Sequence, residues 1–379
     1  MPKHLHRLLS GLLLTLLAPL AVAATGITAN TIVLGQSAAL TGPAQTLGTE
    51  MRDGALAYFE FVNDNGGIDG RKIVLKSLDD GYEPDRAAAN TRELINKEHV
   101  FALFGYVGTA TSLAALPLVA QEDLPFFAPL SGAESLRTPL NHNVFHIRAS
   151  YFSETDKIVE NLGSMGSQRI AVFYQDDAYG QAGLEGVTRA MKKRKMDIVG
   201  VATVERNSAN VAAAVAKMKA LKPRAVIIVA PAESSAAFIR AMSDDPESKP
   251  YFWNISFVGG AALSQLLGPV GRGVMISQVV PAPWEDKLAV VREYKRLYLA
   301  TPGRSAGFVS LEGFIAAKTM VEGMKRAPGG LSRASFIKGM ESMKSYDLGG
   351  FPMHFSADDH TGSDYTDLTV ISSGGKFLY

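Results

Sequence analysis

Short runs of β-branched residues alternate with longer segments of helical periodicity along most of the chain. Apolar residues recur three or four positions apart at Met51, Ala55, Tyr58 and Val62, which predicts one face of a helix that ends at Gly66. Shorter apolar runs predict strands that are buried on both faces. The predicted strands are Thr31–Ala38, Lys72–Leu78, Phe101–Gly105, Arg169–Tyr174, Ile198–Val204 and Ala225–Ala230. This alternation is typical of βαβ units and predicts an α/β fold with parallel sheets.

The pattern restarts near Ser150. Residues 143–148 resemble the end of one sheet, and 153–162 the first helix of a second. A chain of 379 residues exceeds the usual size of one domain, about 100–200 residues, so we expect two. After the second unit the pattern predicts a strand, two helices and two final strands, at 273–280, 286–299, 308–325, 368–371 and 376–378. This order allows the chain to leave the first unit and return to it.

The first residues have the pattern of a secretory signal peptide. Lys3 and Arg7 precede the apolar run Leu8–Leu17, which is too short to span a bilayer. Ala21–Ala23 supplies the small residues that signal peptidase requires. We therefore expect residues 1–24 to be removed and the mature protein to be periplasmic.

Charge and cysteine content exclude several classes of function. The chain has 38 basic and 37 acidic residues, and removal of a signal that carries Lys3 and Arg7 leaves 36 and 37. This near-neutral charge argues against a nucleic-acid partner. The absence of cysteine excludes thiol chemistry, disulfides and lipid attachment at a cysteine, which favours a freely diffusing protein.

The sequence contains no motif for catalysis or metal binding. Walker A, G-x-G-x-x-G, G-x-S-x-G and H-E-x-x-H patterns are all absent. His142 and His146 are four residues apart, but they span a loop and a predicted strand, so we interpret them as surface or hydrogen-bonded histidines. The acidic segment 358–364, which includes His360, lacks the spacing of a calcium loop and is interpreted as a solvated turn. We therefore expect no catalytic residue, no metal and no cofactor.

The most informative segment is Phe101–Ser112, a buried strand that turns through glycines into an apolar helix. The pattern places the helix N-cap at Thr109 or Thr111. Free N–H groups and the positive end of the helix dipole at such a turn can hold a carboxylate, with Gly108 and Thr109 as the contacts. The alternative is that Thr109 only caps its own helix.

A second turn, Pro125–Glu134, likewise predicts a strand that ends in Ser-Gly before a helix. Both turns would open at the carboxyl edge of one sheet, where ligands of open α/β sheets bind. Ser131 and Gly132 are therefore candidate ligand contacts. The alternatives are a helix cap at Ser131 and a positive φ at Gly132.

Five motifs in register carry a family resemblance. They are Ala39–Pro43, Asn65–Arg71, Leu78–Pro84, Gly105–Ser112 and Ser310–Phe314. In this order the chain resembles the type I periplasmic binding proteins of the Leu/Ile/Val-binding family, which are the receptors of branched-chain amino-acid-type ABC transporters. The resemblance covers essentially the whole mature chain.

The resemblance implies two Rossmann-like lobes with parallel central sheets joined by three crossover segments. We expect the first lobe to comprise residues 25–148 and 279–349, and the second 149–278 and 350–379. A small carboxylate-bearing solute would lie between them without cofactor or metal, and a membrane permease would be a transient partner of the monomer. Tyr179 and Phe308 match positions that line the cleft. Their alternatives are the start of a helix for Tyr179 and a core position for Phe308.

The chain departs from the branched-chain amino-acid binders at two places. Leu47 replaces a tyrosine that lines the pocket, and no carboxylate is found at Asn254–Phe257, where the family pairs the ligand's ammonium. An unpaired ammonium in a closed cleft costs several kcal/mol, about the desolvation penalty of one ion. Either Asp177 or Glu233 substitutes, or the ligand is not an α-amino acid.

Two other functions remain open at this stage. A ligand-sensing receptor domain would use the same cleft, with a membrane kinase or channel as its partner. A secreted hydrolase would require Ser131, Asp177 and a histidine to meet in space, although the chain lacks a nucleophile elbow.

Overall fold

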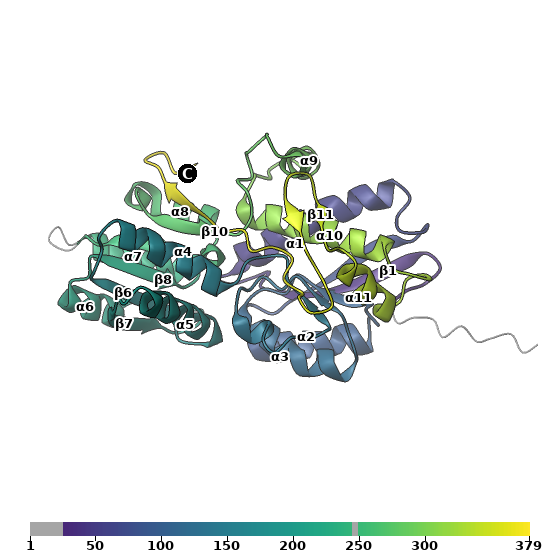
Figure 1. Cartoon of the computed structure of the whole chain (residues 1–379), viewed down its shortest axis with the longest axis horizontal. Coiled ribbons are helices and arrows are strands. Elements are labelled where there is room, and N and C mark those ends of the chain that lie inside the picture. Colours follow the sequence, from purple (N-terminus) through teal and green to yellow (C-terminus); the bar gives the residue numbers. More distant parts are fainter. Residues whose placement is uncertain (1–25, 245–248) are drawn as a thin grey trace, which may run out of the picture.

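The computed structural model describes residues 26–244 and 249–379. The predicted signal peptide and its cleavage site lie outside the described residues. Two α/β lobes lie side by side, each with its own sheet (Figure 1). Within the described ranges, no helix combines the length and the apolarity that a membrane crossing requires.

The first lobe is built on a parallel sheet of five strands in the order β2-β1-β3-β4-β5. Three helices, α9, α10 and α11, join it from later in the chain, and α10 packs along α1 and α11. Its elements are β1 (Thr31–Ala38), α1 (Gln45–Asp64), β2 (Lys72–Asp79), α2 (Pro84–Asn96), β3 (Ala102–Phe104), α3 (Thr109–Gln121), β4 (Phe126–Phe127), η1 (Glu134–Leu136), β5 (Val144–Phe145), α9 (Ala289–Tyr298), α10 (Phe308–Lys325), α11 (Arg333–Glu341), β11 (Tyr346–Asp347) and β12 (Pro352–Met353).

The second lobe has a sheet of seven strands in the order β14-β13-β10-β9-β8-β6-β7. Five strands are parallel, whereas β13 and β14 run antiparallel to their neighbours. Its elements are α4 (Tyr151–Ser164), β6 (Ile170–Gln175), α5 (Ala178–Lys193), β7 (Ile198–Val204), α6 (Ala212–Leu221), β8 (Ala225–Val229), α7 (Ala232–Ser243), β9 (Tyr251–Asn254), η2 (Ser256–Val258), α8 (Gly260–Leu267), η3 (Gly268–Gly271), β10 (Met275–Gln278), β13 (Asp367–Ile371) and β14 (Phe377–Leu378).

The chain passes between the lobes three times, which confirms the predicted architecture. The crossovers lie between β5 and α4, between β10 and α9, and between β12 and β13. β12 pairs with β11, so the third passage follows this pair. The exact lobe boundaries at residues 148, 278 and 349 stay a prediction.

Local sequence explains most of these elements. β6 and β8 are buried at every position, as expected for parallel strands that are covered on both faces. Two glycines explain the close packing of α1 on α10: a Cβ at Gly54 would lie 1.9 Å from the Ser310 carbonyl oxygen, and one at Gly313 would lie 2.2 Å from that of Met51. The Ser310–Phe314 motif therefore serves helix packing.

One predicted element differs in the structure. The segment after Ser131 and Gly132 contains only the three-residue 3₁₀-helix η1, so no α-helix follows this turn. The chain instead reaches β5 and crosses to the second lobe. Apolar residues in the segment pack as core without helical periodicity, which the sequence pattern does not distinguish from a helix.

Candidate ligand-binding site

The first lobe contributes the N-terminus of α3. Its N-cap is Gly108, at φ 104°, and no side chain caps the helix, so the predicted cap at Thr109 or Thr111 is wrong. A Cβ at Gly108 would lie 2.5 Å from Cε2 of Tyr82, which leaves glycine as the residue that fits. Thr109 begins the helix, is fully buried, and has its hydroxyl 2.8 Å from that of Ser131. The hydroxyl of Thr109 is therefore free of any capping role.

The second turn meets the first at this hydroxyl pair. Ser131 Oγ also accepts a hydrogen bond from the Ala133 N–H at 3.2 Å. Gly132 does not have a positive φ, so that alternative is wrong. Glycine is needed there for space, because a Cβ would lie 2.6 Å from Cδ1 of Tyr151.

The second lobe presents aromatic side chains to these turns. Asp177 is the N-cap of α5 and accepts the N–H groups of Tyr179 and Gly180. This cap places Tyr179 in the first turn, with its ring 4.6 Å from that of Phe257 and 5.6 Å from that of Tyr151. Tyr82 of the first lobe lies 6.0 Å from Phe257. We refer to Tyr82, Tyr151, Tyr179 and Phe257 as the aromatic cluster.

The aromatic cluster holds buried polar atoms that have no partner. Among the residues that the structure describes, the Tyr179 hydroxyl has no hydrogen-bond partner. The same holds for Oε1 of Gln175, whose Nε2 lies 3.4 Å from the Tyr82 hydroxyl at the edge of the cluster. The Tyr151 hydroxyl faces Ser131 and Gly132 without ordinary hydrogen-bond geometry. Since buried polar groups in native proteins are nearly always satisfied, such atoms indicate a position for a ligand or water.

Burial keeps these phenols protonated. It raises the pKa of Tyr179 well above its usual value, and neighbouring Tyr151 and Tyr82 raise it further. Burial also raises the pKa of Tyr151 to about 12, although nearby Arg148 opposes this. The cluster therefore offers neutral O–H donors at physiological pH, which suits an anionic acceptor.

Residues after β7 reach across to the first lobe. Arg206 Nη1 donates to the Tyr82 carbonyl at 2.8 Å, and its guanidinium lies 4.6 Å from the ring centre of Tyr82. Asn207 Nδ2 donates to the Gly81 carbonyl at 3.1 Å and to Glu83 Oε1 at 2.6 Å. These contacts join the lobes on one side of the aromatic cluster, so the arrangement is a closed one.

A separate buried cluster lies where the crossovers meet. Arg148 contacts Glu154 Oε1 at 3.3 Å and Glu312 Oε1 at 3.5 Å. The other oxygen of Glu154 accepts the Ser256 N–H at 2.7 Å and the hydroxyl of Ser277. We refer to Arg148, Glu154, Ser256, Ser277 and Glu312 as the hinge cluster.

The structure also places the acids that the sequence offered for a ligand ammonium. Asp177 forms an ion pair with Arg206 and accepts from Gln175 Nε2 at 2.6 Å. Glu233 is exposed, in a groove of about 420 Å³ between the lobes that Leu47 also lines. Glu154 occupies the space beside the Asn254–Phe257 stretch but is paired with Arg148.

Five of the six predicted contacts come together around the aromatic cluster, and Phe308 lies apart from them. Its ring packs 5.4 Å from Trp284 and 5.8 Å from Phe377, in an aromatic group at the start of α10. The ligand role of all six residues stays a prediction.

The sequence analysis missed Tyr82, Tyr151, Gln175 and Phe257. Tyr82 lies in a motif that was quoted only for the resemblance, and Tyr151 directly follows Ser150, the N-cap of α4. The available signal was the presence of aromatic residues directly after a predicted strand, or at the start of the helix near Ser150 where the α/β pattern restarts.

A hydrolytic triad has no geometric support in the described part of the chain, because the Ser131 hydroxyl bonds to Thr109 and Ala133 and to no histidine.

Comparison with known proteins places these features in context. A family model described as a periplasmic binding protein matches residues 31–376. The Leu/Ile/Val-binding protein homolog 7 of Brucella melitensis is 26% identical over 352 residues, which cover 87% of this chain and 84% of that protein. Homolog 3 of the same organism is 26% identical over 189 residues, and the match spans about half of each chain, 50% and 51%.

Solved structures match over nearly the whole chain. A possible leucine/isoleucine/valine-binding protein from Rhodopirellula baltica is 34% identical, with a TM-score of 0.88 and coverage of 93% of this chain and 97% of that one. A branched-chain amino acid ABC transporter protein from Thermus thermophilus with bound valine has a TM-score of 0.79 at 20% identity, covering 92% and 95%. At that identity the second match bears on the fold alone.

Proposed function

This chain belongs to the periplasmic binding protein family, Leu/Ile/Val-binding type, and from this premise we propose that it captures a small carboxylate-bearing solute for an ABC importer. Its relatives are binding proteins, and the names of several refer to leucine, isoleucine and valine. The ligand class is our inference from the site, and the importer is our inference from the family and from a related structure whose name refers to an ABC transporter.

The observation that carries the proposal is the set of donors around the aromatic cluster. The α3 N-terminus supplies backbone N–H groups and the positive end of a helix dipole, and Thr109 supplies a buried hydroxyl beside it. Tyr179 adds a phenol without a partner from the second lobe. Donors that converge from both lobes suit an anionic group.

We propose further that the solute has no α-ammonium. Asp177 is already paired with Arg206, and Glu233 is exposed, so neither offers a buried, free carboxylate. Desolvating an ammonium without such a partner is costly. Organic and aromatic acids therefore fit better than amino acids.

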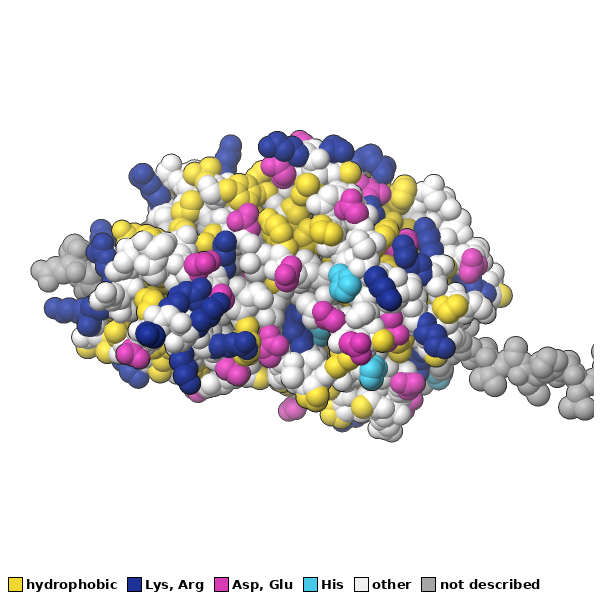
Figure 2. Space-filling model, viewed as in Figure 1, with side chains coloured by type: hydrophobic (Ala, Val, Ile, Leu, Met, Phe, Trp, Pro, Cys, Tyr) yellow, Lys and Arg dark blue, Asp and Glu magenta, His cyan; other side chains and the backbone are white. Residues whose placement is uncertain are grey.

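Closure and delivery complete the proposed cycle. The Arg206 and Asn207 contacts would form as the two lobes close over the solute, and the hinge cluster would stay intact. The closed monomer would then dock transiently on a membrane permease in the periplasm, after removal of the signal peptide. Basic and acidic side chains are scattered among hydrophobic and uncharged ones over the face seen in Figure 2.

Native mass spectrometry of the protein as purified tests the ligand class, because a closed cleft retains its ligand. We expect a bound acid that is lost on denaturation, and calorimetry on stripped protein should show at least tenfold weaker binding of its primary amide. The corresponding α-amino acid should also bind more weakly. Equal affinity for acid and amide would refute the carboxylate proposal.

A further inference from the structure

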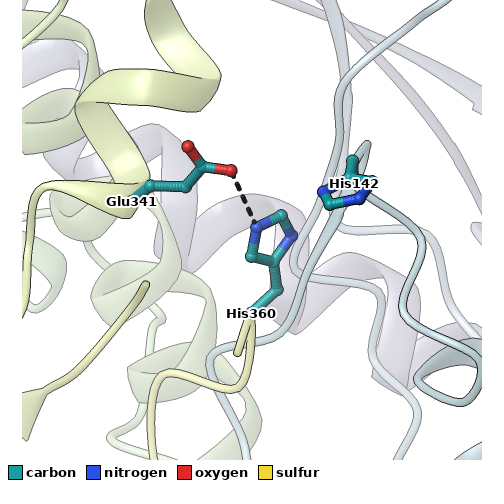
Figure 3. Close-up of side chains that lie close together, drawn as sticks. All are labelled: His142, Glu341 and His360. Carbon is teal, nitrogen blue, oxygen red and sulfur yellow. Dashed lines mark hydrogen bonds and ion pairs between the residues drawn. The ribbon is translucent and has the colours of Figure 1, made fainter. Parts of the chain in front are cut away.

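Three side chains from distant parts of the sequence meet on the first lobe (Figure 3). His142 lies just before β5, Glu341 is the last residue of α11, and His360 lies in the third crossover. One nitrogen or oxygen of each lies within 4.8 Å of the others. The cluster is outside the aromatic cluster and plays no part in the proposed function.

The ring of His360 is held in a single orientation. It stacks on Phe145 with ring centres 3.8 Å apart and planes 15° from parallel. Its Nδ1 lies 3.1 Å from the carbonyl oxygen of Val144, which only accepts, so Nδ1 carries the hydrogen. A backbone carbonyl that receives Nδ1–H is one of the usual outer partners of a metal-bound histidine, beside carboxylates and water.

That bond leaves the Nε2 lone pair facing a carboxylate. Nε2 lies 3.4 Å from Glu341 Oε1, and two acceptors at this separation attract each other only through a cation between them. A proton on Nε2 would serve the pair. The second imidazole, from His142, has its ring centre 6.1 Å from that of His360 and offers a further ligand that a proton does not need.

We propose that His142, Glu341 and His360 form a binding site for a first-row divalent cation, zinc foremost. Two imidazole nitrogens and one carboxylate oxygen are a known zinc ligand set that leaves a fourth position for water, whereas calcium and magnesium prefer oxygen ligands. Bonds of about 2.0–2.1 Å place tetrahedral ligands about 3.3 Å apart. Ligand atoms up to 4.8 Å apart must therefore approach one another by up to about 1.5 Å, which exposed His142 and partly buried Glu341 allow.

The bound cation would tie the third crossover to the first lobe. His360 belongs to the crossover, whereas β5 and α11 belong to the first lobe. A metal that joins segments distant in sequence stabilises the folded state by mass action. Zinc should therefore raise the melting temperature of the protein.

Calorimetric titration of the untagged, EDTA-treated chain with ZnCl₂ tests the proposal. We expect one site per chain with a dissociation constant below about 100 μM. Cobalt(II) should give the intense visible absorption of tetrahedral coordination, and MgCl₂ and CaCl₂ should give no saturable binding. His142→Ala and Glu341→Gln should each weaken zinc binding at least tenfold.

His354→Ala is the matched control, since His354 is an exposed histidine outside the cluster. It should leave the zinc affinity and the zinc-induced rise in melting temperature unchanged. Because His142 is also exposed, His142→Ala should melt like the wild type without metal but lose the zinc-induced rise. Absence of saturable zinc binding, or equal zinc affinity in the wild type, His142→Ala and Glu341→Gln, would overturn the proposal.

Discussion

The aromatic cluster and the hinge cluster are both buried between the lobes, yet they differ in how their polar atoms are satisfied. In the hinge cluster Glu154 accepts from Arg148, Ser256 and Ser277, and only Arg148 Nε lacks a partner. In the aromatic cluster the Tyr151 and Tyr179 hydroxyls have none, and neither has Oε1 of the neighbouring Gln175. Buried polar groups with hydrogen-bond partners stabilise the fold, whereas buried polar groups without partners indicate a place for a ligand.

This difference leads to opposite expectations for mutations. Removal of a partner in the hinge cluster leaves a buried charge, so it should lower stability with little effect that is specific to binding. Removal of an unpartnered hydroxyl in the aromatic cluster should leave stability intact and weaken binding.

The largest effect is expected for Arg148→Ala. Glu154 and Glu312 would stay buried without their cation, which should lower the free energy of unfolding by about 3–5 kcal/mol. Urea denaturation measures this. The control is Lys97→Ala, which breaks an exposed pair with Glu93 and should cost less than about 0.5 kcal/mol. Similar values for the two variants would contradict a structural role for the hinge cluster.

A pH effect is expected at Asp80, a buried acid behind the aromatic cluster. It accepts from the Ser37 hydroxyl at 2.7 Å and the Tyr82 N–H at 2.8 Å, and burial raises its pKa to about 6. The folded chain therefore holds this proton more tightly than the unfolded chain. Its stabilising contribution is complete below about pH 4 and is lost as the pH rises to above 6, with an upper limit of about 3 kcal/mol.

Asp80→Asn replaces the titratable carboxyl group by an amide of nearly the same shape, so the side chain no longer takes up a proton in this pH range. The stability of the variant relative to the wild type should therefore increase between pH 4 and pH 7.5, as measured by urea denaturation at both values. Asp85→Asn, which changes an exposed carboxylate of α2, is the control. Parallel pH profiles for Asp80→Asn and the wild type would exclude a raised pKa at Asp80.

Thr109→Val should weaken binding of the acid that native mass spectrometry identifies. Loss of a hydrogen bond to a charged group costs roughly 1.5–3 kcal/mol, which is about a tenfold to hundredfold loss of affinity. Calorimetry measures it. Thr111→Val is the matched control on the same turn, because the Thr111 hydroxyl bonds back to the carbonyls of Val107 and Gly108. Equal affinity losses in the two variants would remove Thr109 from the site.

The smallest effect is expected for Tyr179→Phe. Its hydroxyl has no partner in the fold, so stability should be unchanged. Loss of its hydrogen bond to the anionic group should weaken binding by about 1.5 kcal/mol, which is roughly tenfold. Tyr106→Phe is the control, since the Tyr106 hydroxyl bonds to Thr91 at 2.9 Å in the core of the first lobe. That variant should lose stability and keep affinity. A loss of stability in Tyr179→Phe together with a loss of affinity in Tyr106→Phe would contradict the distinction between buried hydroxyls with and without partners.

The sequence by itself determined the elements and their class. β1 and β7 match their predicted bounds to the residue, and so does α10, because continuous apolar runs and helical spacing are local signals. The turn at Gly108 and Thr109 was identified from glycines beside hydroxyls. The cap was predicted at Thr109 or Thr111 and lies at Gly108, because a positive φ at Gly108 is a property of the backbone in the fold.

Only the tertiary structure decided which distant residues meet. Tyr82 of the first lobe contacts Phe257 of the second. His142 lies near His360, whereas His146, four residues after His142, bonds to the Leu136 carbonyl. The physical reason is that the three crossovers bring segments more than 100 residues apart into contact. The periodicity of the sequence contains no information about which of these distant residues meet. Whether a buried polar group is satisfied depends on those pairs, and that property separates the aromatic cluster from the hinge cluster.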